Sequence, residues 1–126
     1  MFKTLIVEDN EVFRQSLSEC LSTRFPSMMI DEAWDTHSVL EKVESLLPDL
    51  VLMDIKLPDG NGLGLTRSIK ISHAETVVII ITAYDLPEYR HGAFSAGANY
   101  FLPKGSFGGD GLLDLVESIV NAKGCH

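Results

Sequence analysis

The sequence predicts a doubly wound α/β domain with a five-stranded parallel sheet covered by helices on both faces. Two observations predict this fold class. Short apolar runs alternate with segments of helical spacing along the chain, and 126 residues with 45% hydrophobic content suit one domain with a single core. Parallel strands need crossover connections, so this alternation places helices on both faces of the sheet. We therefore expect one domain over residues 1–126.

The expected strands are apolar runs that are continuous rather than alternating. Continuous apolarity is typical of strands that are buried on both faces. Four such runs occupy residues 5–7, 50–53, 77–81 and, more weakly, 100–102. The segment 28–34 is more polar, so we expect it to form an edge strand.

Helical spacing of side chains predicts the segments between the strands. Asn10 and Thr36 are the expected N-caps of the first two helices. The fourth helix is expected over residues 89–96, ending at Gly97, and the fifth over 112–120. The residues whose spacing predicts the first three helices are Val12, Leu17 and Leu21, then Val39, Val43, Leu46 and Leu47, then Leu63, Arg67 and Ile71.

Composition excludes several classes of function. The formal net charge of −8 argues against direct nucleic-acid binding, which needs a basic surface. Cys20 and Cys125 have neither the number nor the spacing of a disulfide framework or a zinc site, which fits a reducing compartment. The apolar run at residues 5–7 is too short for a signal-peptide core or a membrane span. We therefore expect a cytoplasmic protein with no membrane contact.

Polar residues follow the expected strands where a parallel sheet places its ligands. Open parallel sheets bind ligands beyond the carboxyl ends of their strands. Glu8 and Asp9 follow the first strand, Asp54 ends the third, Thr82 ends the fourth and Lys104 lies just past the fifth. We expect these five side chains to converge.

Three converging carboxylates indicate a metal site. Glu8, Asp9 and Asp54 would repel one another and resist ionisation without a cation. Mg²⁺ suits such a group because it prefers a few carboxylates together with water, carbonyl and phosphate oxygens. With Mg²⁺ and Lys104 present, the charges balance. An ionised Asp54 would then be a nucleophile that needs no general base, and phosphoryl transfer to it would depend mainly on positioning and charge neutralisation.

At this point the sequence resembles the receiver domains of two-component response regulators. That family has an acidic pair, an acceptor aspartate, a serine or threonine, an aromatic residue and a lysine. The matching segments, taken together, are highly specific and spread over the whole chain. They are Val-Glu-Asp-Asn at 7–10, Met-Asp-Ile-Lys-Leu-Pro-Asp-Gly-Asn-Gly at 53–62, Ile-Thr-Ala at 81–83 and Phe-Leu-Pro-Lys at 101–104.

The resemblance implies a flavodoxin-like fold with strand order 2-1-3-4-5 and a role for each site residue. Asp9 would bind Mg²⁺ directly and Glu8 through water. Asp54 would be both ligand and phosphoryl acceptor, and the backbone carbonyl of Lys56 would be a further ligand. Lys104 would assist the transfer to Asp54.

The resemblance also implies a switch. Thr82 would donate its hydroxyl to the phosphoryl group, and the ring of Phe101 would move into the space that Thr82 leaves. Lys56 and Tyr84, each two residues beyond a site residue, are expected at the rim, where their bulk would slow the entry of water. The family commonly has proline after the lysine with a cis peptide bond, whereas Gly105 follows Lys104 here, so the isomer of this bond stays open.

The resemblance implies a phospho-acceptor switch rather than an enzyme with a separate substrate. A sensor histidine kinase or a phosphotransfer protein would supply the phosphoryl group, and the domain would promote its own phosphorylation and dephosphorylation. The output partner is unknown. The fourth helix, fifth strand and fifth helix would form the output surface and a possible homodimer contact.

Two rival functions come from other classes of protein. A haloacid-dehalogenase-like phosphatase also uses an aspartate nucleophile and Mg²⁺, but it needs a second aspartate two residues later, where this chain has Lys56. A receiver-like binding module that never becomes phosphorylated is the other rival. The complete set of acidic pair, acceptor and lysine argues against it.

Overall fold

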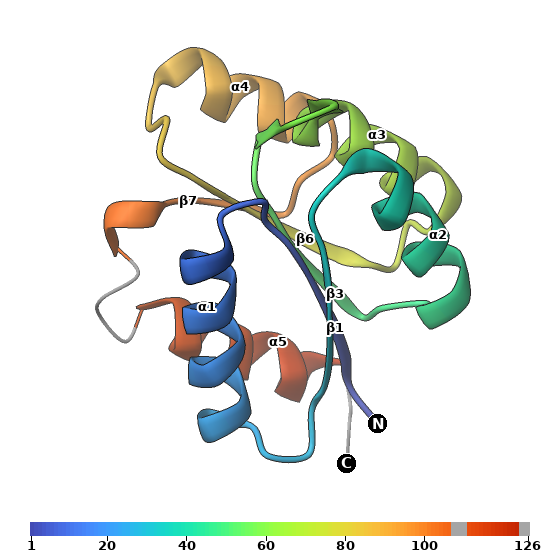
Figure 1. The fold of residues 1–126 in the computed structure, drawn as a ribbon, viewed down its shortest axis with the longest axis vertical. Helices are drawn as coiled ribbons and strands as arrows, with labels where there is room; N and C mark the ends of the chain where they lie inside the picture. The colour runs from blue at the N-terminus through green and yellow to red at the C-terminus, as the bar shows by residue number, and fades with distance from the viewer. Residues whose placement is uncertain (107–110, 124–126) are drawn as a thin grey trace.

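The computed structural model describes residues 1–106 and 111–123, so Cys125 lies outside the described part. A five-stranded parallel sheet forms its centre, in the order β2-β1-β3-β6-β7 (Figure 1). These are the five predicted strands in the predicted order 2-1-3-4-5. Their bounds are β1 Lys3–Val7, β2 Met29–Ala33, β3 Leu50–Met53, β6 Val77–Thr82 and β7 Tyr100–Pro103.

Helices cover both faces of the sheet, as the alternating pattern predicts. One face carries α1 and α5, and the other carries α2, α3 and α4 (Figure 1). The helices span Glu11–Arg24 (α1), Thr36–Leu46 (α2), Gly62–Ser72 (α3), Pro87–Ser95 (α4) and Gly111–Ala122 (α5), and a short 3₁₀ turn, η1, spans Lys104–Ser106. No helix in these described ranges is long and apolar enough to cross a membrane.

Successive strand residues feed two separate cores. On β1, Leu5 and Val7 pack with α2, α3 and α4, whereas Ile6 packs with α1 and α5. Successive strand side chains point to opposite faces, so a strand between two helical layers must be apolar at every position. This explains why β3 is buried along its whole length. The more polar β2 lies at the edge of the sheet, as predicted.

The start of α2 corrects one predicted cap. Thr36 was the expected N-cap, but the cap is Asp35, whose side chain accepts the amide of Ser38 at 2.8 Å. Thr36 is instead the first helical residue, and its amide and hydroxyl both donate to Asp59, at 2.9 and 2.8 Å. Asn10 caps α1 as predicted, by accepting the amide of Phe13.

The spacing of apolar residues predicted the buried side of α3 wrongly and that of α1 correctly except at Val12. In α3, Ile71 is 78% exposed and Arg67 is exposed, while Leu65 and Ile69 are buried. In α1, Val12 is 75% exposed, although Leu17 and Leu21 are buried as expected. Both segments carry apolar residues on more than one stripe, so spacing alone does not select the buried one.

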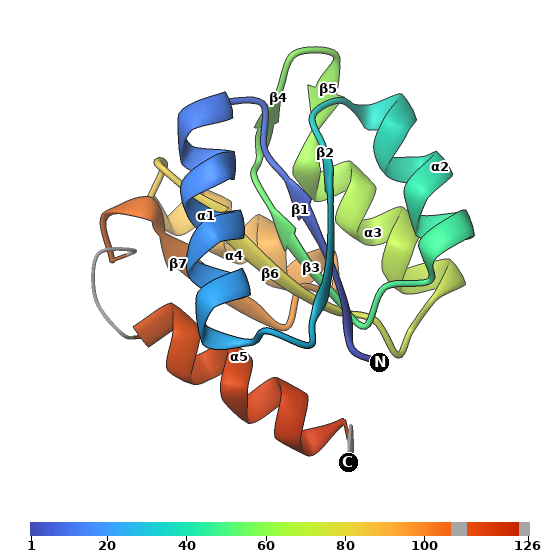
Figure 2. The same cartoon turned by 60° about the horizontal axis from the view of Figure 1, so that its bottom comes forward.

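A small hairpin that was not among the expected strands follows β3. It consists of β4 (Lys56–Leu57) paired antiparallel with β5 (Gly60–Asn61). Figure 2 shows it beyond the carboxyl edge of the sheet, and the bonds of Asp59 to Thr36 tie it to the start of α2. The hairpin therefore holds the chain that follows Asp54 close to that edge.

Side chains occupy the backbone amide and carbonyl of Glu32 on the outer edge of β2. The backbone hydrogen bonds of Met29 and Ala33 run toward β1. The backbone amide and carbonyl of Glu32, the residue before Ala33, therefore point away from β1, toward the open edge. Its amide donates to the side chain of Asp31 at 2.8 Å, and its carbonyl accepts Lys42 of α2 at 2.6 Å. Asp31 and Lys42 also form an ion pair at 2.9 Å.

Candidate functional site

The carboxyl ends of neighbouring strands bring the predicted site residues to one edge of the sheet. Val7 of β1 pairs in register with Met53 of β3, so Glu8 and Asp54, the next residues, leave the sheet at the same level. Asp9 follows Glu8, and Lys104 follows directly on β7. This is the convergence that strand order and ligand placement in parallel sheets predict.

Glu8, Asp9 and Asp54 form an acidic cluster with one oxygen of each within 4.8 Å of the others. It is the only group of three or more acidic, histidine or cysteine side chains with this spacing in the described residues. Glu8 is 2% exposed and Asp54 is 6% exposed, whereas Asp9 faces solvent. Two of the three anions therefore lie where water stabilises them poorly.

Lys104 is the cation at the cluster. Its ammonium lies 2.7 Å from the Glu8 carboxylate and 3.4 Å from that of Asp54. Burial lowers the pKa of Lys104, but the hydrogen bond to Glu8 and the charge of Asp54 outweigh burial, so this pKa lies above its ordinary value. Lys104 therefore stays charged beside the two carboxylates.

The Glu8 carboxylate is poorly stabilised without a further cation. Burial raises its pKa to about 7, although hydrogen bonds from Lys104 and the Asn10 amide act in the opposite direction. The charge of Asp54 also raises this pKa. One lysine therefore does not compensate three carboxylates, and an oxygen-only donor set with excess negative charge fits Mg²⁺.

Gly62 lets the chain pack against Asp54. A Cβ atom at Gly62 would overlap the backbone carbonyl oxygen of Asp54, and it would lie 3.0 Å from the side chain of Met53. The Gly62 amide donates to the carbonyl of Ile55 at 2.7 Å, which fixes the start of α3 beside the site. No role for Gly62 was evident from the sequence, although Gly62 belongs to the segment that carries the resemblance.

Thr82 is the last residue of β6, and Phe101 is the second residue of the neighbouring strand β7. Thr82 is fully buried, and its hydroxyl oxygen accepts the amide of Tyr84 at 3.1 Å. Phe101 is 4% exposed, and the guanidinium of Arg90 in α4 lies 4.8 Å from its ring centroid. The two predicted switch residues therefore occupy the adjacent strands that lead from the cluster to α4.

An open cleft of about 380 Å³ gives access to the cluster. Besides the acidic residues and Lys104, its lining includes Lys56 and Tyr84, the two residues expected at the rim. The Lys56 side chain is exposed. No peptide bond among the described residues is cis, so the Lys104–Gly105 bond, which the sequence left open, is trans.

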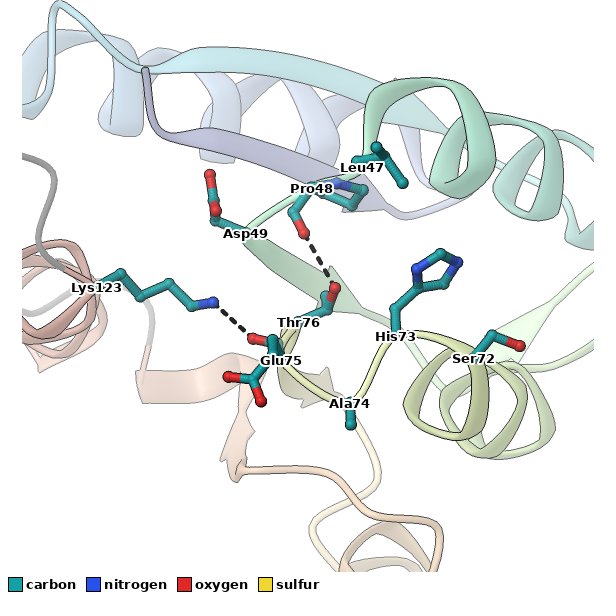
Figure 3. A pocket seen from close by; sticks show the side chains of 9 residues that line it. All are labelled: Leu47, Pro48, Asp49, Ser72, His73, Ala74, Glu75, Thr76 and Lys123. Atoms are coloured by element: carbon teal, nitrogen blue, oxygen red, sulfur yellow. Dashed lines mark hydrogen bonds between the residues drawn. The ribbon is translucent and has the colours of Figure 1, made fainter.

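A second hollow lies at the opposite, amino-terminal edge of the sheet (Figure 3). Thr76 donates to the Pro48 carbonyl at 3.0 Å, and Lys123 donates to the Glu75 carbonyl at 2.5 Å. These bonds join the loops before β3 and β6 to each other and to α5. Its lining includes Asp49, His73 and Glu75, but within the described part of the chain only Glu8, Asp9 and Asp54 lie close enough together for a metal ion, so we place the functional site at the carboxyl edge.

Fold and site together define a doubly wound α/β protein with an acidic, lysine-bearing site at the carboxyl edge of a parallel sheet. The model of the response regulator receiver domain family matches residues 4–117. The chain therefore belongs to the receiver domain family of two-component response regulators.

Individual relatives agree with this assignment. The chain is 30% identical to the response regulator GacA of Pseudomonas syringae pv. syringae over 119 residues, which are 94% of this chain and 54% of GacA. It is 31% identical to the transcriptional activator DevR/DosR of Mycobacterium tuberculosis over 82% of this chain and 48% of that protein. The chain thus spans about half the length of these relatives.

Solved structures share the fold over nearly the whole chain. A CheY-like receiver domain from Methanospirillum hungatei superposes with a TM-score of 0.86 at 26% identity, over 98% of this chain and 97% of that one. A LuxR-family response regulator from Aurantimonas superposes with a TM-score of 0.85, also at 26% identity, over 95% of this chain and 85% of the other.

Proposed function

We propose that this receiver domain accepts a phosphoryl group on Asp54 in a Mg²⁺-dependent reaction. The observation that carries the proposal is the geometry around Asp54, a carboxylate that is 6% exposed beside two further carboxylates and 3.4 Å from a lysine ammonium. The donor would be the phosphohistidine of a sensor histidine kinase or of a phosphotransfer protein.

The residues that would hold the metal are Asp9, Asp54, the backbone carbonyl of Lys56 and, through water, Glu8. When bound, Mg²⁺ would neutralise charge on the phosphoryl oxygens and on the carboxylates. The exposed Asp9 faces the solvent from which the ion arrives, while the buried Glu8 sets the negative potential behind it.

The chain's own residues supply the nucleophile and the second cation. Asp54 attacks phosphorus as an anion, and the bond from phosphorus to the donor histidine nitrogen breaks as the new P–O bond forms. Lys104, already within 3.4 Å of Asp54, moves its ammonium onto a transferred oxygen and so offsets the added charge. Thr82 then donates its hydroxyl hydrogen to a second oxygen.

Phosphorylation would act on partners through the α4 side of the molecule. Thr82 and Phe101 connect the site to β7 and α4, so the surface of α4, β7 and α5 is the proposed output and homodimer surface. We propose a cytoplasmic switch whose only covalent chemistry is on itself. The net charge of −8 argues against direct nucleic-acid binding by this domain.

Intact-mass measurement after incubation with acetyl phosphate and Mg²⁺ tests the proposal. We expect one phosphoryl adduct in the parent chain, none in Asp54→Asn, and none in the parent when EDTA replaces Mg²⁺. Asp59→Asn is the matched control, because Asp59 lies in the same hairpin region but binds Thr36 instead of the cluster. An adduct that persists in Asp54→Asn would remove Asp54 as the acceptor.

A further inference from the structure

Three side chains meet across the mouth of the site. The ammonium of Lys56 lies 5.3 Å from the ring centroid of Tyr84 and 5.7 Å from that of Tyr89. The two rings are themselves 5.6 Å apart and tilted by 47°. Both cation–ring distances are within the range in which an ammonium is attracted to an aromatic face.

These side chains come from β4, from the loop after β6 and from α4. Lys56 begins β4, two residues after Asp54, and lines the cleft. Tyr84 also lines the cleft, and its amide is bonded to the hydroxyl of the buried Thr82. Tyr89 lies in the first turn of α4 and packs against the core on that face of the sheet.

We propose that Tyr89 is a positioning residue that holds Lys56 across the mouth of the site and so couples the position of α4 to access to Asp54. This inference rests on the proposed function, because access matters only if Asp54 carries the phosphoryl group. The bulk of Lys56 and Tyr84 alone would not involve α4. The contact with Tyr89 gives control of the rim to a helix that does not line the cleft.

The two tyrosine rings restrict where the Lys56 ammonium lies. The Lys56 side chain is long and solvent-exposed, so without an attachment it would sample many rotamers and leave the mouth open. Two tyrosine rings give it one favoured position. An exposed cation–ring contact contributes only a modest free energy, so the bridge opens and closes readily and its closed population responds to small changes.

Coupling of this kind acts in both directions. A partner that displaces Tyr89 when it binds α4 would release Lys56 and shorten the lifetime of the phosphoryl group. A partner that holds Tyr89 in place would lengthen it. Conversely, when Thr82 moves, Tyr84 moves with it through their hydrogen bond, so phosphorylation changes the contact that α4 makes with the rim.

Phosphoryl decay after removal of donor tests the coupling. We expect Tyr89→Leu to speed the decay roughly two- to fivefold, the ratio that corresponds to losing one exposed cation–ring contact. Tyr89→Phe keeps the ring and should decay like the parent. Phe94→Leu is the matched control on the same helix, because Phe94 is 46% exposed and should leave decay unchanged.

A double-mutant cycle distinguishes the effect of the Lys56–Tyr89 contact on phosphoryl decay from the effect of side-chain size. Lys56→Met keeps the length of the side chain but removes its charge, so it should speed decay as Tyr89→Leu does. The double variant should then decay no faster than either single variant. Unchanged decay in Lys56→Met, or effects of the two changes that multiply, would overturn the proposal.

A second measurement needs neither metal nor phosphoryl group. Aromatic rings shift nearby protons, so the ε-methylene NMR signals of Lys56 should move toward free-lysine values in Tyr89→Leu and stay in place in Phe94→Leu. Signals that do not move would refute the contact. If the parent forms no adduct at all, the proposed function fails. If it forms one that decays alike in parent and Tyr89→Leu, only the coupling fails.

Discussion

The backbone of Gly62 lies against the carbonyl of Asp54 so closely that no side chain fits between them. The same glycine begins α3, and its amide is bonded to Ile55. The acceptor residue and the first turn of a helix are therefore held at a separation that only glycine permits.

Gly62→Ala should disturb the site, and Gly64→Ala should not. A methyl group at Gly62 meets backbone, which cannot rotate away, so we expect a loss of about 1–3 kcal/mol of unfolding free energy. Phosphoryl acceptance should also slow. Gly64 lies in the same helix with nothing within 4 Å of its Cβ position, so alanine there should stabilise by up to about 1 kcal/mol. Urea unfolding and adduct formation, measured on both variants, give the comparison, and equal stability of the two would contradict the close packing.

Asp9→Ala should weaken Mg²⁺ binding sharply, because it removes a direct carboxylate ligand. Glu8→Ala should have the smaller effect, since Glu8 is expected to act through water. Glu11→Ala is the control, as Glu11 lies in the first turn of α1 and outside the cluster. Calorimetric titration gives the ranking, and equal affinity in Asp9→Ala and the parent would refute the ligand assignment.

Trp34 offers an optical readout of the same titration. The guanidinium of Arg14 lies 4.8 Å from the Trp34 ring centroid and also donates to the backbone carbonyl of Glu8 at 2.9 Å. A shift of Glu8 on metal binding is therefore transmitted to the tryptophan through one side chain. We expect Mg²⁺ to change Trp34 fluorescence in the parent and to change it less in Arg14→Gln.

Thr82→Ala should leave phosphorylation of Asp54 largely intact but reduce the response of the α4 surface. Phosphorylation changes the charge of the metal-loaded site from zero to about −1, and the added oxygens need donors. Without its hydroxyl, Thr82 cannot follow them, and Tyr84 loses its bond to the Thr82 oxygen. Hydrogen exchange over residues 84–104, with and without beryllofluoride, measures the response. An identical change in variant and parent would exclude Thr82 from the switch.

Acid should weaken the start of α2 through Asp35. Its hydrogen bond from the Ser38 amide lowers the pKa of Asp35 below the ordinary 3.8, while the neighbouring charges of Asp59 and His37 act in opposite directions. Because the folded pKa is the lower one, the stabilisation is fully present above pH 3.8 and is lost as the pH falls through the folded value. Asp35→Asn keeps a cap that does not titrate. Urea unfolding should therefore show the parent losing more stability than Asp35→Asn between pH 7 and pH 3, and a constant difference would contradict the prediction.

The sheet and the cluster were predictable because each has a strong local signal. The continuous apolarity of residues 50–53 and 77–81 reflects burial on both faces, which strand order alone requires. Once the strands are placed, the acidic pair and Asp54 must meet at their carboxyl ends. The sequence also indicated that these carboxylates would resist ionisation, but it attributed this to mutual repulsion, whereas burial is the main cause of the raised pKa of Glu8.

Other features were not predictable because they depend on contacts between distant segments. Thr36 looked like a cap because a threonine hydroxyl can accept a helix amide, but this hydroxyl donates instead to Asp59, which reaches it from another part of the chain. The buried stripe of α3 follows from the packing of Gly62 on Asp54, so Ile71 turns outward despite its apolar side chain. The contact between Lys56 and Tyr89 joins residues whose types carry no motif.

The outer edge of β2 bears on how copies of this chain can meet. An incoming strand would need the amide and carbonyl of Glu32, both already taken by Asp31 and Lys42. It would have to break their ion pair before gaining a ladder bond at that position, and charged side chains on an edge strand discourage such pairing. Growth of the sheet from one molecule into the next is thus opposed at this position, so copies of the domain that crowd together have less tendency to join along β2.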